Sequence, residues 1–121
     1  MYRLVIVNGD SMIPTLHSGD RVLVRLATLR RIRQSDLVVF ARPRTETGWM
    51  IKRVVALPGD VIPRRSVPAL WGYPGSRVPP DRFVVLGDNP AESYDSRSFG
   101  YLTGSALLGV VVRRLRPAKS A

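Results

Sequence analysis

Short apolar segments, interrupted again and again by Gly, Pro and Asp, run through the whole chain. Such a pattern is typical of many strands joined by turns, because long helices need apolar residues at a sustained 3.6-residue period. The strands predicted in this way cover residues 4–7, 21–25, 37–41, 49–57, 82–86 and 107–115. The sequence therefore predicts a mainly β fold, with a mostly antiparallel, coiled or folded-over sheet.

The connections between these strands are less regular. Residues 26–33 hold the best helical period, and the pairs Gly19-Asp20 and Gly59-Asp60 are expected to form turns. Residues 63–80 contain five prolines, each of which removes a donor from a strand ladder, so we expect a surface excursion there. A length of 121 residues favours a single domain, which we expect over residues 1–116, followed by a disordered tail at 117–121.

The composition leaves few groups for proton-transfer chemistry. The chain has no Cys and a single His, His17, so thiol nucleophiles, disulfides and Cys-based metal sites are excluded. The net charge is +10, carried by 17 Arg and only two Lys, Lys52 and Lys119. That charge is compatible with nucleic acid, an anionic membrane surface or acidic partners. The preference for Arg over Lys is explained more simply by genomic base composition than by a binding partner.

No apolar run approaches the roughly 20 residues that cross a bilayer, and the N-terminal apolar segment is too short for a signal peptide. We therefore expect a soluble protein, and the cytoplasm is one of the compartments in which such a protein could be located. If a native anchor has been removed, we expect a domain at the outer face of the cytoplasmic membrane.

The first of three segments that carry chemistry follows the opening strand and reads Gly-Asp-Ser-Met-Ile-Pro-Thr-Leu, residues 9–16. A serine between a flexible glycine and a proline-stiffened turn can be held at a strand end with its hydroxyl accessible. A nucleophilic serine also needs a base to take its proton. Without one, Ser11 is an ordinary turn serine that bonds to its own backbone.

The second segment, residues 51–60, offers that base. Alternation along the strand places Lys52 on the face of Met50 and Val54, and Arg53 on the opposite face. If Lys52 is the inward residue, burial lowers its pKa and makes it a usable general base. A lysine whose stem lies along a half-buried strand, with its amine in water, is the alternative.

The third segment, residues 86–100, is dense in side chains that bond to backbone and to each other. Asp95 and Arg97 can form a charge-assisted pair, and Ser93 is close enough to interact with a neighbouring amine. A rigid polar loop of this kind can orient a catalytic lysine, or it can be a well-bonded but silent hairpin.

Together, the three segments resemble the conserved boxes of the type I signal peptidases, serine/lysine endopeptidases that remove signal peptides from exported proteins. The resemblance keeps the order and rough spacing of the boxes and implies Ser11 as nucleophile and Lys52 as general base, with no cofactor and no metal. It implies supporting roles for Gly9, Asp10, Ser93, Asp95 and Arg97, and substrate contacts from Met12 and Pro14. The resemblance also implies the Ser11 backbone N–H as one oxyanion donor, and it leaves the second unassigned because Gly9 stands where some members carry a serine.

The resemblance further implies precursor proteins with a signal peptide or propeptide as substrates, cut after small residues of the Ala-x-Ala type. An anionic membrane surface is the expected second partner, and nucleic acid is not expected. Two alternatives stay open: a maturation peptidase dedicated to one partner, such as a nickel superoxide dismutase precursor, and a fragment of a LexA-like self-cleaving regulator. A nucleic-acid-binding barrel would need an aromatic stacking array that the sequence does not present.

Overall fold

The computed structural model describes residues 1–45 and 47–115, so the tail predicted at 117–121 lies outside the described residues. Within these ranges the chain forms seven strands: β1 (Tyr2–Ile6), β2 (Arg21–Leu26), β3 (Leu37–Ala41), β4 (Trp49–Ala56), β5 (Arg82–Leu86), β6 (Leu102–Thr103) and β7 (Leu107–Leu115). They make one sheet in the order β1-β2-β7-β3-β4-β5-β6, with every neighbouring pair antiparallel. The predicted mainly β, antiparallel, folded-over fold is confirmed.

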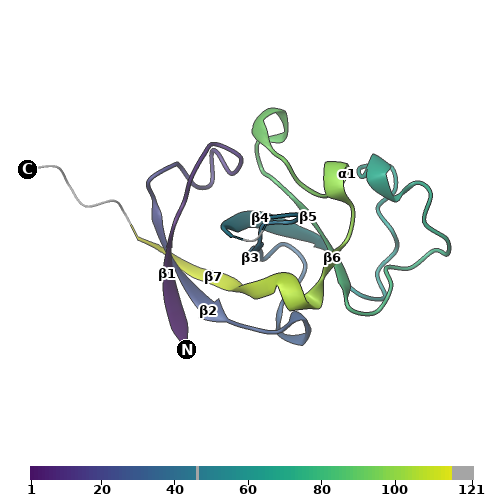
Figure 1. Ribbon diagram of the computed structural model, residues 1–121, viewed down its shortest axis with the longest axis horizontal. Helices are drawn as coiled ribbons and strands as arrows, with labels where there is room; N and C mark the ends of the chain where they lie inside the picture. The colour runs from purple at the N-terminus through teal and green to yellow at the C-terminus, as the bar shows by residue number, and fades with distance from the viewer. Residues whose placement is uncertain (46, 116–121) are drawn as a thin grey trace, which may run out of the picture.

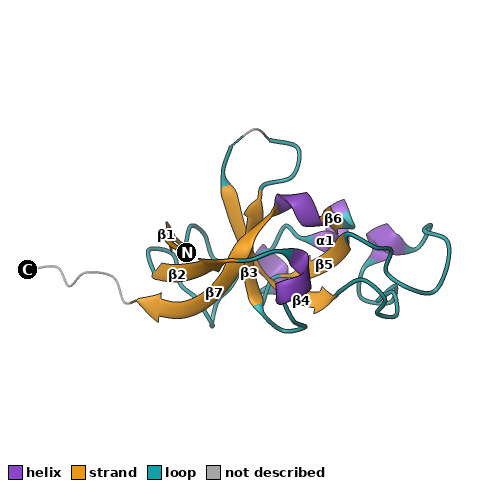
Figure 2. Ribbon diagram, turned by 90° about the horizontal axis from the view of Figure 1, so that it is seen from below, coloured by secondary structure: helices purple, strands orange, loops and turns teal. Residues whose placement is uncertain are grey.

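The sheet is curled, so that β1, β2 and β7 lie on one side of the molecule and β5 and β6 on the other (Figure 1). The curl is helped by register shifts in the pairings of β7 with β2 and β3, and of β4 with β5, since an extra residue in one strand increases local twist. The helical turns gather on the side that holds β5 and β6 (Figure 2). They are the 3₁₀ turns η1 (Leu29–Arg31), η2 (Pro68–Leu70), η3 (Pro90–Glu92) and η4 (Gly104–Ala106), and the one-turn helix α1 (Ser96–Phe99).

Strand β3 is buried on both faces of the sheet. Val38, Val39 and Phe40 are all fully buried, although successive residues of a strand point to opposite faces. Val38 and Phe40 join one apolar cluster with Phe83 and Val110. Val39 joins a second cluster, which includes Met12. The unbroken apolar run in this strand therefore reflects burial on both sides.

Two segments differ from what their local sequence indicated. The helical period of residues 26–33 does not produce a helix: Leu26 still pairs with Gly109 in the sheet, and only the short turn η1 follows. Ile32 then leaves the turn to enter the core, where it is 5% exposed. Tertiary pairing and burial have overridden the weak helical preference of this segment.

The segment 63–80 holds no named strand, as its prolines predicted, but it is more than a surface excursion. Val67, Leu70 and Val78 are almost completely buried and form a third apolar cluster with Val84 of β5. The aromatic Trp71, in contrast, is 65% exposed. Aliphatic residues of this loop thus cover the outer face of β5.

Candidate active site

The loop that carries Ser11 is anchored at both ends of its span. Val7 at the end of β1 donates its N–H to the carbonyl of Asp20 at 2.8 Å, and Gly19 donates to the carbonyl of Val7 at 2.8 Å. Gly9 adopts φ +84°, a left-handed conformation that favours glycine, and turns the chain into the loop. The apolar side chain of Leu16 is buried beneath it. These contacts hold Ser11 at the end of an ordered strand.

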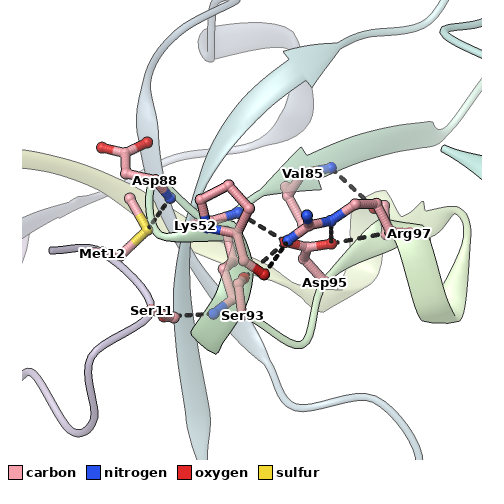
Figure 3. A network of polar contacts seen from close by, with 11 residues as sticks. Ser11, Met12, Lys52, Val85, Asp88, Ser93, Asp95 and Arg97 are labelled. Carbon is pink, nitrogen blue, oxygen red and sulfur yellow. Dashed lines mark hydrogen bonds and ion pairs between the residues drawn. The ribbon is translucent and has the colours of Figure 1, made fainter. Parts of the chain in front are cut away.

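Lys52 reaches the same point from β4. Its side chain is 3% exposed and lies on the inward face of the strand with Met50 and Val54, whereas Arg53 is half-buried on the opposite face. The Lys52 Nζ donates a hydrogen bond to the Ser11 Oγ at 2.6 Å, and Figure 3 shows the lysine side chain directed at the serine. Of the two alternatives raised by the strand pattern, the buried lysine is the one found.

The surroundings of Lys52 favour its neutral form. Burial lowers the pKa of the lysine amine from 10.5 to about 8, and the positive charges of Arg42 and Arg97 act in the same direction. The negative charge of Asp95 raises the pKa and so limits the shift. A lysine with a pKa of about 8 has a neutral fraction at physiological pH that an ordinary lysine lacks.

Asp95 is the centre of the polar loop that faces Lys52. Its carboxylate is fully buried and accepts hydrogen bonds from Arg97 (Nε at 2.9 Å, a terminal guanidinium nitrogen at 2.8 Å and the backbone N–H at 3.1 Å), from the Ser93 Oγ at 2.7 Å and from the Gly87 N–H at 2.9 Å. Burial alone would raise the pKa of Asp95, but these hydrogen bonds outweigh it and keep the pKa below its usual range. Figure 3 shows Asp95 between Ser93 and Arg97.

The structure thus brings Ser93, Asp95 and Arg97 together with Ser11 and Lys52, as expected. The Ser93 hydroxyl donates to Asp95, so its proton is directed away from the lysine amine. Ser93 also fixes the space available at Gly87, where a Cβ atom would lie 2.1 Å from the Ser93 Oγ and 2.8 Å from the Ser11 carbonyl oxygen. Glycine is therefore required at position 87 because the backbone passes so close to both serines.

Sequence reasoning missed a second link between the three segments. Asp88 forms a two-point ion pair with Arg53 (Nε to Oδ1 2.9 Å, the terminal nitrogen to Oδ2 2.7 Å) and accepts a hydrogen bond from the Thr15 Oγ1 at 2.5 Å. The hydrogen bond from Arg53 is the main reason why the pKa of Asp88 is lowered. Asn89 adds a bond from its side-chain nitrogen to the carbonyl of Asp10 at 2.9 Å. The only signal in the sequence was the density of polar side chains in the third segment.

The residues predicted to contact substrate lie in different environments. Met12 lines the groove beside Ser11, but its side chain is only 1% exposed and packs in the core, and its sulfur accepts a hydrogen bond from the Asp88 N–H at 3.4 Å. Pro14 is exposed and does not line the groove, and Asp10 is exposed at the loop surface. A role in substrate binding for Met12 or Pro14 stays a prediction.

A groove of about 540 Å³ opens on the Ser11 hydroxyl and runs between β1 and the start of β4. Strand β1 is an edge of the sheet, because it pairs with β2 alone. Residues 49–52 of β4 pair with β3, and pairing with β5 begins only at Arg53. On both walls of the groove, the side of the strand that faces the groove is therefore not paired with another strand, so its backbone N–H and C=O groups are open to pairing.

Comparison with known proteins assigns the family. The family model described as signal peptidase, peptidase S26, matches residues 1–68 and 65–115. The chain belongs to this signal peptidase family. It is 32% identical to signal peptidase I of Bacillus caldolyticus, over 94% of this chain and 79% of that protein. It is also 30% identical to mitochondrial inner membrane protease subunit 1 of Schizosaccharomyces pombe, over 97% of this chain and 75% of that protein.

A plant relative is similar over a comparable length. The mitochondrial ATP-independent inner membrane protease subunit 1b of Arabidopsis thaliana is 37% identical over 90% of this chain and 67% of its own length. Membership of the signal peptidase family, predicted from the three segments, is confirmed, and the protein is a serine endopeptidase of signal peptidase type. None of the described helices is both long and apolar enough to cross a membrane.

Proposed function

We propose that this signal peptidase family member cleaves precursor proteins with a Ser11/Lys52 dyad, and that residues 1–116 act as one catalytic domain. The observation that carries the proposal is the 2.6 Å contact between the Ser11 Oγ and the Lys52 Nζ. It involves the one lysine in the described residues, which is buried and has a lowered pKa. A serine and a base in direct contact are the minimum that nucleophilic catalysis by a hydroxyl requires.

In this mechanism, neutral Lys52 accepts the proton of the Ser11 hydroxyl while the Oγ attacks the scissile carbonyl. The lysine then donates that proton to the departing amine, which leaves an acyl-enzyme on Ser11. Lys52, neutral again, takes a proton from a water molecule whose oxygen attacks the ester carbonyl, and it then returns that proton to the departing Ser11 Oγ, which releases the second product and restores the free serine. The Lys52–Ser11 contact supports this proposal in both half-reactions, because the lysine takes a proton from Ser11 in the first and returns one to it in the second.

The oxyanion of the tetrahedral intermediate needs hydrogen-bond donors next to Ser11. We assign the backbone N–H of Ser11 as one donor, since it makes no hydrogen bond to any other group in the described ranges. Asp95, through its bonds to the Gly87 N–H and the Ser93 hydroxyl, would hold the backbone that faces this loop. Ser93, Asp95 and Arg97 are positioning residues in this proposal.

We infer that the substrate binds as an extended strand in the groove. The unpaired backbone edges of β1 and of residues 49–52 can both form hydrogen bonds with a peptide backbone. Such pairing contributes affinity that does not depend on the side chains of the substrate. The carbonyl to be cut would then lie at Ser11, near the end of β1. Selectivity for small residues of the Ala-x-Ala type would follow if the almost fully buried Met12, which lines the groove, limits the space for a substrate side chain.

The proposed substrates are proteins that carry a signal peptide or propeptide, at the surface of an anionic membrane. The name of the Bacillus caldolyticus relative supports this substrate class, and the names of the Schizosaccharomyces pombe and Arabidopsis thaliana relatives place those proteins at an inner membrane. A propeptide carried by one dedicated partner is a substrate of the same chemistry. The charge of +10 supports attraction to the membrane surface.

The test is cleavage of an exported precursor containing Ala-x-Ala, incubated with the protein in lipid and mapped by mass spectrometry. Wild-type protein should cut after the second alanine, and Ser11→Ala and Lys52→Ala should each lose all detectable turnover while keeping the wild-type circular dichroism spectrum. Ser66→Ala, at an exposed serine on another loop, is the matched control and should retain full activity. Turnover by either dyad variant would remove Ser11 and Lys52 from the mechanism.

A further inference from the structure

Four arginines surround a hollow that is separate from the candidate active site. It has a volume of about 690 Å³ and is formed where β2 leads into η1 and then into β3. We call it the arginine hollow; its lining is Arg25, Leu26, Ala27, Arg30, Arg31, Ile32, Arg33 and Asp36. None of these residues lines the groove at Ser11.

The backbone that carries the arginines is fixed by its own contacts. Ala27 donates to the carbonyl of Leu108 in β7 at 3.2 Å, and Arg31 donates to the carbonyl of Thr28 at 2.9 Å. Ile32 is 5% exposed and anchors the segment in the core. The backbone that carries the four arginines, from the end of β2 through η1 to residue 33, is therefore ordered, which reduces the backbone entropy that must be lost when a ligand binds.

The charge in the hollow is not neutralised within the described part of the chain. Asp36 is the one acidic residue in the lining, and its Oδ2 accepts the backbone N–H of Arg33 at 2.8 Å. The ion pairs found in these ranges involve Arg53, Arg82 and Arg97, and none involves an arginine of the hollow. All four are exposed, so their donors face solvent and are available to an anion.

The hollow lies at the opposite end of β1 from Ser11. Figure 1 shows the β2–β3 connection near the N-terminus, whereas the loop that follows β1 lies on the far side of the molecule. Tyr2 pairs with Arg25, and the carbonyl of Met1 accepts the N–H of Leu26 at 3.0 Å. Met1 and Tyr2 are 89% and 59% exposed. Exposed apolar side chains thus lie directly beside the arginines.

We propose that the arginine hollow is a binding site for a phosphate group. Guanidinium groups bind phosphate oxygens through two parallel hydrogen bonds, and several of them around one hollow suit a compact, multiply accepting anion. The phosphate can come from the headgroup of an anionic phospholipid or from a free phosphate, and the apolar side chains of Met1 and Tyr2 fit the lipid. A nucleic acid fits less well, because the lining has no aromatic residue and Tyr2 beside it offers one ring, not the row of rings on which successive bases stack. The proposal does not depend on the Ser11/Lys52 mechanism.

The experiment compares Arg30→Gln/Arg31→Gln with a control that removes the same charge elsewhere, Arg65→Gln/Arg77→Gln, at two exposed arginines. Inorganic phosphate is titrated into each 121-residue protein, and binding is followed by NMR of the arginine Nε–H groups. Sedimentation with vesicles of phosphatidylcholine, with and without phosphatidylglycerol, forms the second arm. We expect phosphate binding to weaken about tenfold in the hollow variant and to change little in the control.

The outcomes separate the two sources. If vesicle binding falls together with phosphate binding, the ligand is a lipid headgroup; if only phosphate binding falls, it is a free phosphate. Arg30→Lys/Arg31→Lys keeps the charge and should lose part of the affinity, because lysine lacks the planar fork. Equal losses in the hollow variant and the control, no phosphate binding by wild-type protein, or tighter binding to a single-stranded oligonucleotide than to the vesicles would each overturn the proposal.

Discussion

The Lys52 Nζ lies 2.6 Å from the Ser11 Oγ, although 41 positions separate the two residues in the chain. The contact is made because Ser11 follows an edge strand, β1, and Lys52 projects inward from β4, on the other wall of the same groove. The lysine is desolvated, and the acid that faces it, Asp95, is already engaged by Arg97. The sheet thus holds the Lys52 amine against the Ser11 hydroxyl, and the proposed dyad leads to four predictions that can be measured.

The first prediction concerns the pH dependence of cleavage. Because burial lowers the pKa of Lys52 to about 8, the neutral amine that accepts the Ser11 proton increases about tenfold per pH unit below that value. We expect kcat/KM for a peptide substrate to rise with that slope from pH 6 and to level off above pH 8. A steady-state pH profile checks this, and a profile flat from pH 6 to pH 9 would contradict a lysine base.

The second prediction concerns the cost of burying Lys52. The unfolded chain holds the Lys52 proton up to about pH 10.5, whereas the folded protein holds it only up to about pH 8. Between these values the unfolded chain binds more protons, so the free energy of unfolding rises with pH; below pH 8 the whole cost, about 3 kcal/mol, is present. Lys52→Met, which keeps the size of the side chain, should therefore be more stable than wild-type protein at pH 7, with the difference shrinking towards pH 10.

Urea unfolding of wild-type protein and Lys52→Met at a series of pH values measures this difference. The comparison between the two proteins cancels the titration of all other groups to first order. A stability difference that stays constant from pH 7 to pH 10 would show that Lys52 is not desolvated in the folded protein.

The third prediction concerns Asp95. Asp95→Asn removes a fully buried negative charge that accepts hydrogen bonds from Arg97, Ser93 and Gly87, and such a loss should lower the free energy of unfolding by about 3 kcal/mol. Since Asp95 raises the pKa of Lys52, the acidic limb of the kcat/KM profile should also move to lower pH. Asp81→Asn is the control: its carboxylate is 66% exposed and 3.7 Å from Arg82.

For Asp95→Asn, chemical denaturation measures the free energy of unfolding, and the pH profile of kcat/KM shows in which direction the acidic limb moves. A destabilised variant with an unmoved acidic limb would mean that Asp95 acts on the fold alone.

The fourth prediction concerns Gly87. An alanine there would place its Cβ 2.1 Å from the Ser93 Oγ and 2.8 Å from the Ser11 carbonyl oxygen. Either the loop that carries Ser93 or the loop that carries Ser11 must therefore shift. A displacement of about 1 Å at a reacting group can cost about 100-fold in rate, and we expect a loss of kcat of that order in Gly87→Ala. Gly72→Ala, where a Cβ meets no atom within 4 Å, should keep wild-type kcat in the same assay.

Local patterns in the sequence were enough to place most of the fold. Alternation and apolar runs located the strands within a few residues of their observed ends, because a strand's side-chain period is written into consecutive positions. The two-residue strand β6 was missed, since two residues show no period. The helical period of residues 26–33 did not produce a helix, because the burial of Ile32 and the pairing of Leu26 outweighed local preference.

The sequence by itself determined which residues are candidates for the chemistry: without cysteine, and with Lys119 close to the chain end, it left Lys52 as the candidate base for Ser11. Only the tertiary structure decided that Lys52 faces inward and that its amine contacts the Ser11 hydroxyl. It also decided that Asp88 binds both Arg53 and Thr15, and so connects β4 to the loop that carries Ser11. It also decided which four of 17 arginines gather at one hollow. The reason is physical: period and composition are local, whereas contacts between distant positions depend on strand order, register and the curl of the sheet.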